Sequence, residues 1–163
     1  MTTIHAYTMD QSLQDHVHSD LRRARATGVN LVPTRTGAAS AIGLVIPELR
    51  GRIDGFAVRV PTPTVSLIDF VVELNRPTST EQVNQVFRDA SASEELEGIL
   101  GVSEDALVSS DYIGTTYSAV VDLALTMSLG EDLFKIVAWY DNEWGYASRV
   151  ADLAAYIAEG FEE

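Results

Sequence analysis

The chain has 163 residues, of which 46% are hydrophobic, 24 are acidic and 11 are lysine or arginine, giving a formal net charge of −13. Residues 1–163 are therefore expected to form one domain with a sizeable core, and this composition excludes a disordered chain. The negative charge argues against nucleic acid and anionic membranes as partners.

No apolar run reaches the roughly 18 residues that a membrane helix needs. The N-terminal segment MTTIHAYTMD lacks the basic and apolar regions of a signal peptide, so a cytoplasmic location is expected. The chain has no cysteine, which excludes disulfide bonds and excludes thiol catalysis by this chain alone.

Lysine is rare among the basic residues, because Lys135 is the one lysine beside ten arginines. An acidic, lysine-poor chain suits a halophilic cytoplasm, since the Debye length falls to about 3 Å at 1 M salt and self-repulsion is screened. A GC-rich genome produces the same bias toward arginine. The composition alone leaves both explanations open.

The N-terminal third predicts two extended segments, a loop and a helix. Residues 2–7 alternate between apolar and polar side chains, which predicts a strand. About twenty mostly polar residues follow and predict a long irregular loop, of a length that is usually functional or disordered. Residues 30–33 predict a short extended piece. Thr36 predicts the start of a helix that ends at Pro47, with an apolar face made of Ala38, Ala41, Ile42 and Val45.

Residues 55–61 and 65–74 predict two strands. The second strand is apolar on both faces, so both faces need to be covered. Helices can cover one face. A second subunit can cover the other, which predicts an oligomer, or the same chain can cover it, and the sequence leaves that choice open.

The second half predicts helices and strands that are largely segregated. The spacing of apolar residues predicts a helix over residues 79–90, capped by Ser79 or Thr80. Residues 107–112, 117–125 and 134–139 predict strands. A final helix is expected to begin at Glu143 or Gly145, with Val150, Leu153, Ala154 and Ile157 facing inward. This order predicts an α+β fold with a mixed, largely antiparallel sheet and helices on one face.

The run WYDNEWGY, Trp139 to Tyr146, places an amide and two carboxylates among four aromatic rings. Four other segments accompany it in the order TTIHAYT, DLRRAR, PTRTGAA and RVPTPTVSLIDF. Together the five motifs resemble the C-terminal catalytic domain of phosphorylating glyceraldehyde-3-phosphate dehydrogenase, over residues 2–156. The resemblance implies a large sheet with helices on one face and subunit interfaces of a homotetramer on the other.

The resemblance also implies a function in glucose metabolism, in glycolysis or gluconeogenesis. The full enzyme of this family oxidises glyceraldehyde 3-phosphate with NAD or NADP and inorganic phosphate to 1,3-bisphosphoglycerate. No segment here resembles the family's G-x-G-x-x-G turn or its S-C-T-T-N nucleophile motif. We therefore expect an N-terminal half to be missing, and the isolated chain to be inactive and to bind the cofactor weakly. The alternative is a non-catalytic oligomerisation or phosphate-binding module.

His5 and Arg59 are the first candidate site residues. A histidine between apolar neighbours is either a buried, hydrogen-bonded side chain or, as the resemblance implies, the general base. Arg59 lies on a predicted strand, where an unpaired guanidinium is costly. Its partner is either Asp69, in an ion pair, or the phosphate of the substrate, as the resemblance implies. Thr8 is implied to share that phosphate site.

A second anion site, for inorganic phosphate, is implied at Thr36 and Gly37, although a simple helix cap explains the same residues. Arg35 stands where the family has a small hydroxyl residue, and its role stays open. Arg23 belongs to a basic cluster with Arg22 and Arg25. These arginines either pair with acidic residues of the loop or a neighbouring subunit or, as the resemblance implies for Arg23, face the anion sites.

Two residues are implied to contact the cofactor: Asn142 through the nicotinamide carboxamide, and Tyr146 by packing near the ring. Val17 departs from the family's small residue at a position that helps to choose between NAD and NADP, so that preference stays open. His16 and His18 form an H-x-H pair without a third well-spaced ligand, and no metal site is expected. Trp139 is interpreted as core packing.

Overall fold

The computed structural model of the chain describes residues 1–160, and only the backbone at residues 39 and 40. The strands in this range are β1 (Thr2–Ala6), β2 (Val32–Arg35), β3 (Phe56–Val60), β4 (Ser66–Glu73), β5 (Leu100–Ser103), β6 (Ala119–Asp122), β7 (Met127–Leu129) and β8 (Leu133–Tyr140). The α-helices are α1 (Ala38–Val45), α2 (Thr80–Ser91) and α3 (Trp144–Glu159). Short 3-10 helices cover Thr27–Val29, Pro47–Leu49, Ser109–Tyr112 and Leu123–Leu125.

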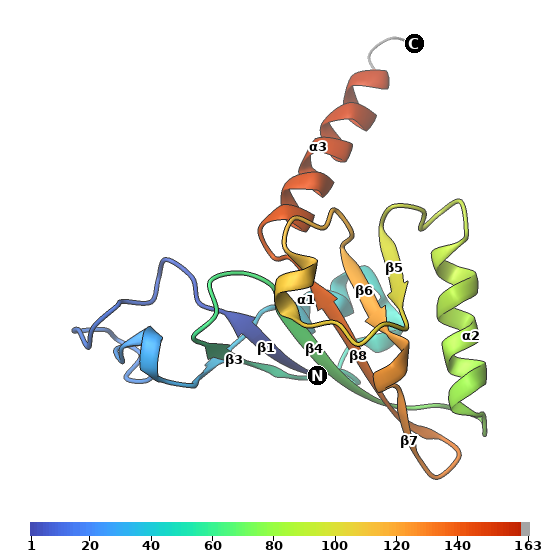
Figure 1. The fold of residues 1–163 in the computed structure, drawn as a ribbon, viewed down its shortest axis with the longest axis horizontal. Coiled ribbons are helices and arrows are strands. Elements are labelled where there is room, and N and C mark those ends of the chain that lie inside the picture. Colours follow the sequence, from blue (N-terminus) through green and yellow to red (C-terminus); the bar gives the residue numbers. More distant parts are fainter. Residues whose placement is uncertain (161–163) are drawn as a thin grey trace.

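The strands form one sheet in the order β2-β3-β1-β4-β8-β6-β5, with β7 paired to β8 (Figure 1). The pairs β1–β3 and β5–β6 are parallel, and the other pairs are antiparallel. The longest pairing joins β4 to β8 over all eight residues of each strand. This arrangement confirms the predicted α+β fold with a mixed, largely antiparallel sheet.

The main core lies between the sheet and α2. Phe134 is almost fully buried there, together with Val121, Leu123 and Ile136, and Val83 and Phe87 of α2 pack against them. Ser79 caps α2 in a capping box with Gln82, as its position before the apolar spacing predicted. Phe70 and Val72 of β4 face this core, whereas Val71 faces away from it and is 50% exposed.

Some predicted elements differ from the observed ones. Residues 107–112 were expected as a strand, but they end in a 3-10 helix, because the Asp111 carboxylate accepts a hydrogen bond from the Val108 amide and closes a turn. Only residues 119–122 of the expected strand 117–125 are extended. The strands β5 and β7 were not predicted, since each has only three or four residues and no clear alternation.

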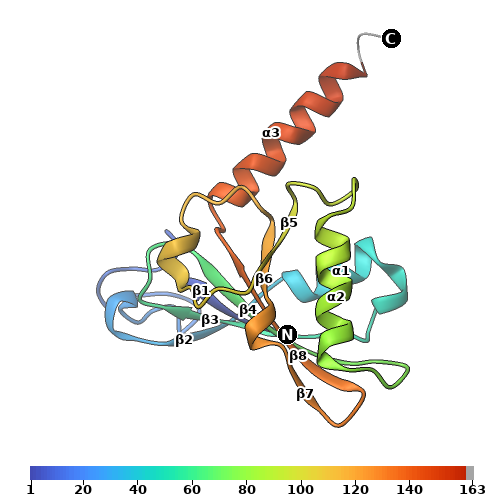
Figure 2. The ribbon, with the colours of Figure 1, turned by 45° about the vertical axis from the view of Figure 1, so that its right-hand side comes forward.

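The last helix begins where expected but does not pack inward. Figures 1 and 2 both show α3 projecting from the sheet, and its expected inner residues Val150, Leu153 and Ile157 are 49%, 57% and 49% exposed. Helix α1 likewise leaves Val45 81% exposed. An amphipathic pattern predicts which face of a helix is buried, but not whether the covering surface belongs to the same chain. No helix within residues 1–160 is long and apolar enough to cross a membrane.

Candidate functional site

His5 and Arg59 lie side by side because β1 and β3 pair in parallel with these two residues in register. Nη1 of Arg59 is 2.6 Å from Nδ1 of His5 and 2.9 Å from the carbonyl oxygen of Ala6. Nδ1 of His5 also lies 2.7 Å from the carbonyl oxygen of Ala6, so this nitrogen either donates to Ala6 or accepts from Arg59, according to the tautomer of the ring. In the tautomer that donates to Ala6, Nε2 carries the free lone pair of the ring. Within residues 1–160, Nε2 has no hydrogen-bond partner.

The electrostatics around His5 favour its neutral form. Burial lowers the pKa of the imidazole below its ordinary value, and the charge of Arg59 lowers it further. The Ala6 carbonyl and Glu143 oppose this shift without cancelling it. The edge of the ring contacts Tyr140, with ring centroids 6.0 Å apart. A neutral imidazole in this place is able to accept a proton near pH 7.

Arg59 does not pair with Asp69, which was the alternative to a ligand. Asp69 forms an ion pair with Lys135 instead, at 2.8 Å. In the described part of the chain no carboxylate lies within ion-pair distance of Arg59, and burial lowers the pKa of its guanidinium. A half-buried guanidinium without a carboxylate in ion-pair contact keeps N–H donors with which an anion can bond.

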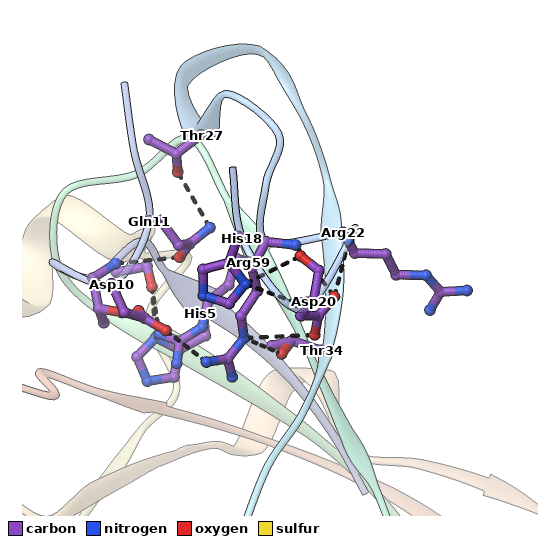
Figure 3. Close-up of polar contacts among 12 residues, drawn as sticks. His5, Asp10, Gln11, His18, Asp20, Arg22, Thr27, Thr34 and Arg59 are labelled. Carbon is purple, nitrogen blue, oxygen red and sulfur yellow. Dashed lines mark hydrogen bonds and ion pairs between the residues drawn. The ribbon is translucent and has the colours of Figure 1, made fainter. Parts of the chain in front are cut away.

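The long loop brings Asp10 and Arg23 close enough for their charges to act on Arg59, and Figure 3 shows Asp10 on the same side as Arg59 and His5. The Thr8 hydroxyl donates to the Asp10 carboxylate, which also pairs with Nη1 of Arg23 at 2.6 Å. Nε of Arg23 donates to the Thr34 hydroxyl at 2.8 Å, so the loop is tied to β2. The hydrogen bond from Thr8 and the charges of Arg23 and Arg59 lower the pKa of Asp10. An anion entering here would meet two guanidinium groups beside one carboxylate.

Two arginines of the basic cluster, Arg23 and Arg25, pair with acidic residues of the loop. Arg25 pairs with Asp15 at 3.0 Å, as the loop interpretation predicted. Arg23 also lies 3.9 Å from Asp20, so it takes part in loop pairing as well as lying near Arg59. The rings of His16 and His18 contact each other edge-on, with centroids 5.6 Å apart.

Thr36 and Gly37 lie at the junction of β2 and α1. Gly37 is the N-cap residue, not Thr36 as expected, but the Thr36 hydroxyl accepts a hydrogen bond from the Ala38 amide at 3.2 Å. No hydrogen bond joins Thr36 to His5, Arg23 or Arg59 in residues 1–160. Asp10 links Thr8 and Arg23 and is affected by the charge of Arg59, whereas Thr36 forms its hydrogen bond within its own turn.

Asp141 fixes the start of α3. Its Oδ1 accepts hydrogen bonds from the Thr64 hydroxyl at 3.2 Å and from the amides of Glu143 and Trp144, each at 3.0 Å. Its Oδ2 accepts from the Gly114 amide at 2.8 Å. Burial alone would raise the pKa of this carboxyl, but these donors outweigh burial and lower it. Sequence reasoning had assigned no role to Asp141.

Asn142 is held by a serine of the neighbouring strand. Oδ1 of Asn142 accepts from the Ser66 hydroxyl at 3.0 Å, and the same hydroxyl accepts from the Ala6 amide at 3.1 Å. Asn142 is thus linked to the strand that bears His5. Sequence reasoning missed Ser66, whose only signal was a small polar residue at the start of an apolar strand.

The aromatic residues of this segment fall into two groups. Trp139 stacks on Tyr112 with ring centroids 5.4 Å apart, and its indole nitrogen donates to Asp122 at 3.1 Å, so the expected core role is confirmed. Trp144 and Tyr146 are 56% and 74% exposed. Tyr146 is therefore available to pack against a ligand or another protein surface.

Comparison with known proteins gives the family. The profile described as "Glyceraldehyde 3-phosphate dehydrogenase, C-terminal domain" matches residues 1–142. "Glyceraldehyde-3-phosphate dehydrogenase 2" of Trichormus variabilis is 60% identical over 159 residues, which are 98% of this chain and 47% of that protein.

Two further relatives come from other organisms. "Glyceraldehyde-3-phosphate dehydrogenase A, chloroplastic" of Zea mays is 55% identical over 97% of this chain and 39% of that protein. "Glyceraldehyde-3-phosphate dehydrogenase 1" of Bacillus subtilis is 53% identical over 98% of this chain and 47% of that protein. The chain spans about half the length of the curated relatives it matches. It belongs to the glyceraldehyde-3-phosphate dehydrogenase family and corresponds to the C-terminal domain of that family.

Proposed function

We propose that this chain is the catalytic half of a phosphorylating glyceraldehyde-3-phosphate dehydrogenase that acts in glycolysis or gluconeogenesis. The observation that supports this best is the contact between Arg59 and His5, in which a half-buried guanidinium without a carboxylate partner lies 2.6 Å from a neutral imidazole. Such a pair places an anion-binding group directly beside a proton acceptor. A phosphorylated aldehyde is a substrate that needs both.

In this proposal Arg59 binds the phosphate of glyceraldehyde 3-phosphate, with Thr8 and Arg23 alongside. His5 takes up the proton released as the substrate is oxidised, because its pKa is lowered by burial and it is neutral near pH 7. Thr36 and Gly37, at the start of α1, bind inorganic phosphate as the second substrate.

NAD or NADP would accept the hydride when bound. Asn142 and Tyr146 fit this group, because Ser66 donates to the Asn142 oxygen and the amide nitrogen, which donates one proton to Glu143, has a second proton for a carboxamide. The exposed ring of Tyr146 lies four residues away on the first turns of α3. The chain has no cysteine, so the thiol nucleophile of this chemistry must come from outside it. We therefore propose that residues 1–163 alone perform no redox step.

The substrate site is tested in a hybrid enzyme, in which this chain replaces the matching region of the Trichormus variabilis relative. Arg59→Gln should raise the KM for glyceraldehyde 3-phosphate by about 10- to 100-fold, because a charged hydrogen bond is lost. Arg88→Gln is the matched control, since Arg88 pairs with Glu81 and Glu104 on the α2 side of the molecule. An equal KM in the hybrid and its Arg59→Gln variant would refute the assigned role of Arg59.

The alternative function is a non-catalytic assembly module that keeps the anion site. It is favoured by the exposed apolar residues of α3 and by the missing cysteine. The same hybrid separates the two, because a module without catalytic ancestry would bind phosphate but form no NADH.

A further inference from the structure

We propose that Ser66 is a positioning residue that fixes which way the Asn142 amide faces. The proposal concerns a hydrogen-bonded chain of three groups: the Ala6 amide, the Ser66 hydroxyl and the Asn142 side chain. The effect on cofactor binding rests on the proposed function. The orientation of the Asn142 amide is independent of that function.

The direction of this chain of hydrogen bonds is set by its first member. The backbone amide of Ala6 can only donate, so the Ser66 oxygen accepts from it at 3.1 Å. A hydroxyl group has a single proton, and at 3.0 Å from Oδ1 of Asn142 that proton is donated to the asparagine. Oδ1 therefore faces Ser66, and Nδ2 faces the opposite way, 3.4 Å from Oε1 of Glu143.

Burial makes the orientation selective. Ser66 is 2% exposed, so water does not compete for its hydroxyl. An Asn142 amide turned by 180° would bring an N–H donor against the Ser66 oxygen, which already accepts from Ala6, and the Ser66 proton would lose Oδ1 of Asn142 as its acceptor.

The backbone beside Ser66 also departs from ordinary strand geometry. Val65 has a φ of 65°, a conformation that a β-branched residue rarely adopts, and it is buried at 3% exposure. Such strain persists only where the surrounding structure holds it. Here it turns the chain directly before Ser66, at the point where the hydroxyl must reach both β1 and the segment after β8.

Ser66 links the two halves of the candidate site. On one side it binds the strand that bears His5, through the residue next to that histidine. On the other side it binds the asparagine implied to hold the nicotinamide. We infer that this hydroxyl sets the orientation of the cofactor ring relative to His5, because it turns the NH2 group of Asn142 away from Ser66, where one N–H contacts Glu143 and the other can donate to the carboxamide.

The first test needs no cofactor. In the 163-residue chain, the side-chain NH2 resonances of Asn142 are identified by their loss in Asn142→Ala. Ser66→Ala should move them toward positions typical of a solvent-exposed amide, whereas Thr126→Val should leave them unchanged. Thr126 is a fair control because its hydroxyl is also buried, at 8% exposure, but does not contact Asn142. Unmoved Asn142 resonances in Ser66→Ala would overturn the proposal.

Ser66→Ala also removes the acceptor of a buried amide, so the variant has a risk of unfolding. Ser66→Cys keeps the size of the side chain with much weaker hydrogen bonds, and serves the same test in that case. The same shift is expected for Cys, and unmoved resonances would count against the proposal in the same way.

The second test is a double-mutant cycle for NADH binding in the hybrid enzyme. Ser66→Ala should weaken binding about 5- to 10-fold in the wild-type background, as for the loss of one hydrogen bond. In the Asn142→Ala background it should have almost no effect, because Ser66 acts through Asn142. Equal losses of NADH affinity in both backgrounds would show that Ser66 has a merely structural role and does not act through Asn142. A hybrid that binds no NADH would refute the proposed function, while the resonances of Asn142 would still decide the role of Ser66.

Discussion

At the scale of single residues, the proposed function depends on His5, a histidine that the fold keeps neutral. Burial and the charge of Arg59 lower the pKa of His5, and the register of β1 against β3 places these two side chains together. In the folded state His5 therefore binds fewer protons than in the unfolded state at mildly acidic pH. The same property that makes it a proton acceptor makes folding sensitive to acid.

This linkage has a defined sign. The unfolded histidine titrates near its ordinary pKa of 6.5, and the folded one titrates lower. The unfolded state thus gains protons first as the pH falls, so the free energy of unfolding decreases below pH 6.5. Urea unfolding between about pH 8 and pH 5 should show a shallower acid loss for His5→Gln than for the unmodified chain. Identical slopes would mean that His5 is not held neutral.

The sequence predicted some site residues but not their partners. The motifs HAYT and RVPTP led to His5 and Arg59 through their resemblance to the family, because the residues alone also allow a buried histidine and an internal ion pair. The structure was needed to show that they contact each other and that Asp69 pairs with Lys135. Ser66 and Asp141 were not predicted, since a buried serine or aspartate gains its role only from donors that are distant in sequence.

At the scale of elements, the start of α3 depends on one carboxylate. Asp141 accepts four hydrogen bonds, from residues 64, 114, 143 and 144, and so joins the end of β8, the turn before β4 and the loop at residue 114. This junction also places Asn142. The strength of the junction is measurable by removing the carboxylate.

Asp141→Ala should lower the free energy of unfolding by about 2–4 kcal/mol, because three backbone amides lose a charged acceptor in a buried place. Asp152→Ala is the matched control. Asp152 pairs with Arg149 on the exposed side of α3, and its loss should cost less than about 1 kcal/mol. Urea unfolding of both variants gives the comparison, and similar losses for the two would contradict the role assigned to Asp141.

Elements with strong local signals were predicted well. The capping box and apolar spacing of α2, and the doubly apolar β4, depend on residues close in sequence. The segment 107–112 failed because apolar residues at both ends suggested a strand, while the Asp111 carboxylate favoured a turn. The short strand β5 forms because it pairs with β6. A pattern of residues that are close in sequence does not reveal this pairing.

At the scale of the whole molecule, the described residues leave one long helix largely uncovered. Helix α3 projects from the sheet with half-exposed apolar residues (Figure 2), and the family profile ends at residue 142, before that helix begins. The relatives are about twice as long as this chain. The proposed site also needs a thiol and a dinucleotide fold that these 163 residues do not provide.

The most direct measurement is the rate of NADH formation by the hybrid enzyme with glyceraldehyde 3-phosphate, NAD and inorganic phosphate. The hybrid should form NADH, the 163-residue chain alone should form none, and His5→Asn should reduce the kcat of the hybrid by about 10²- to 10⁴-fold, as for the loss of a general base. Turnover by the chain alone, or an unchanged kcat in folded His5→Asn, would contradict the claim that this chain supplies the base but not the nucleophile.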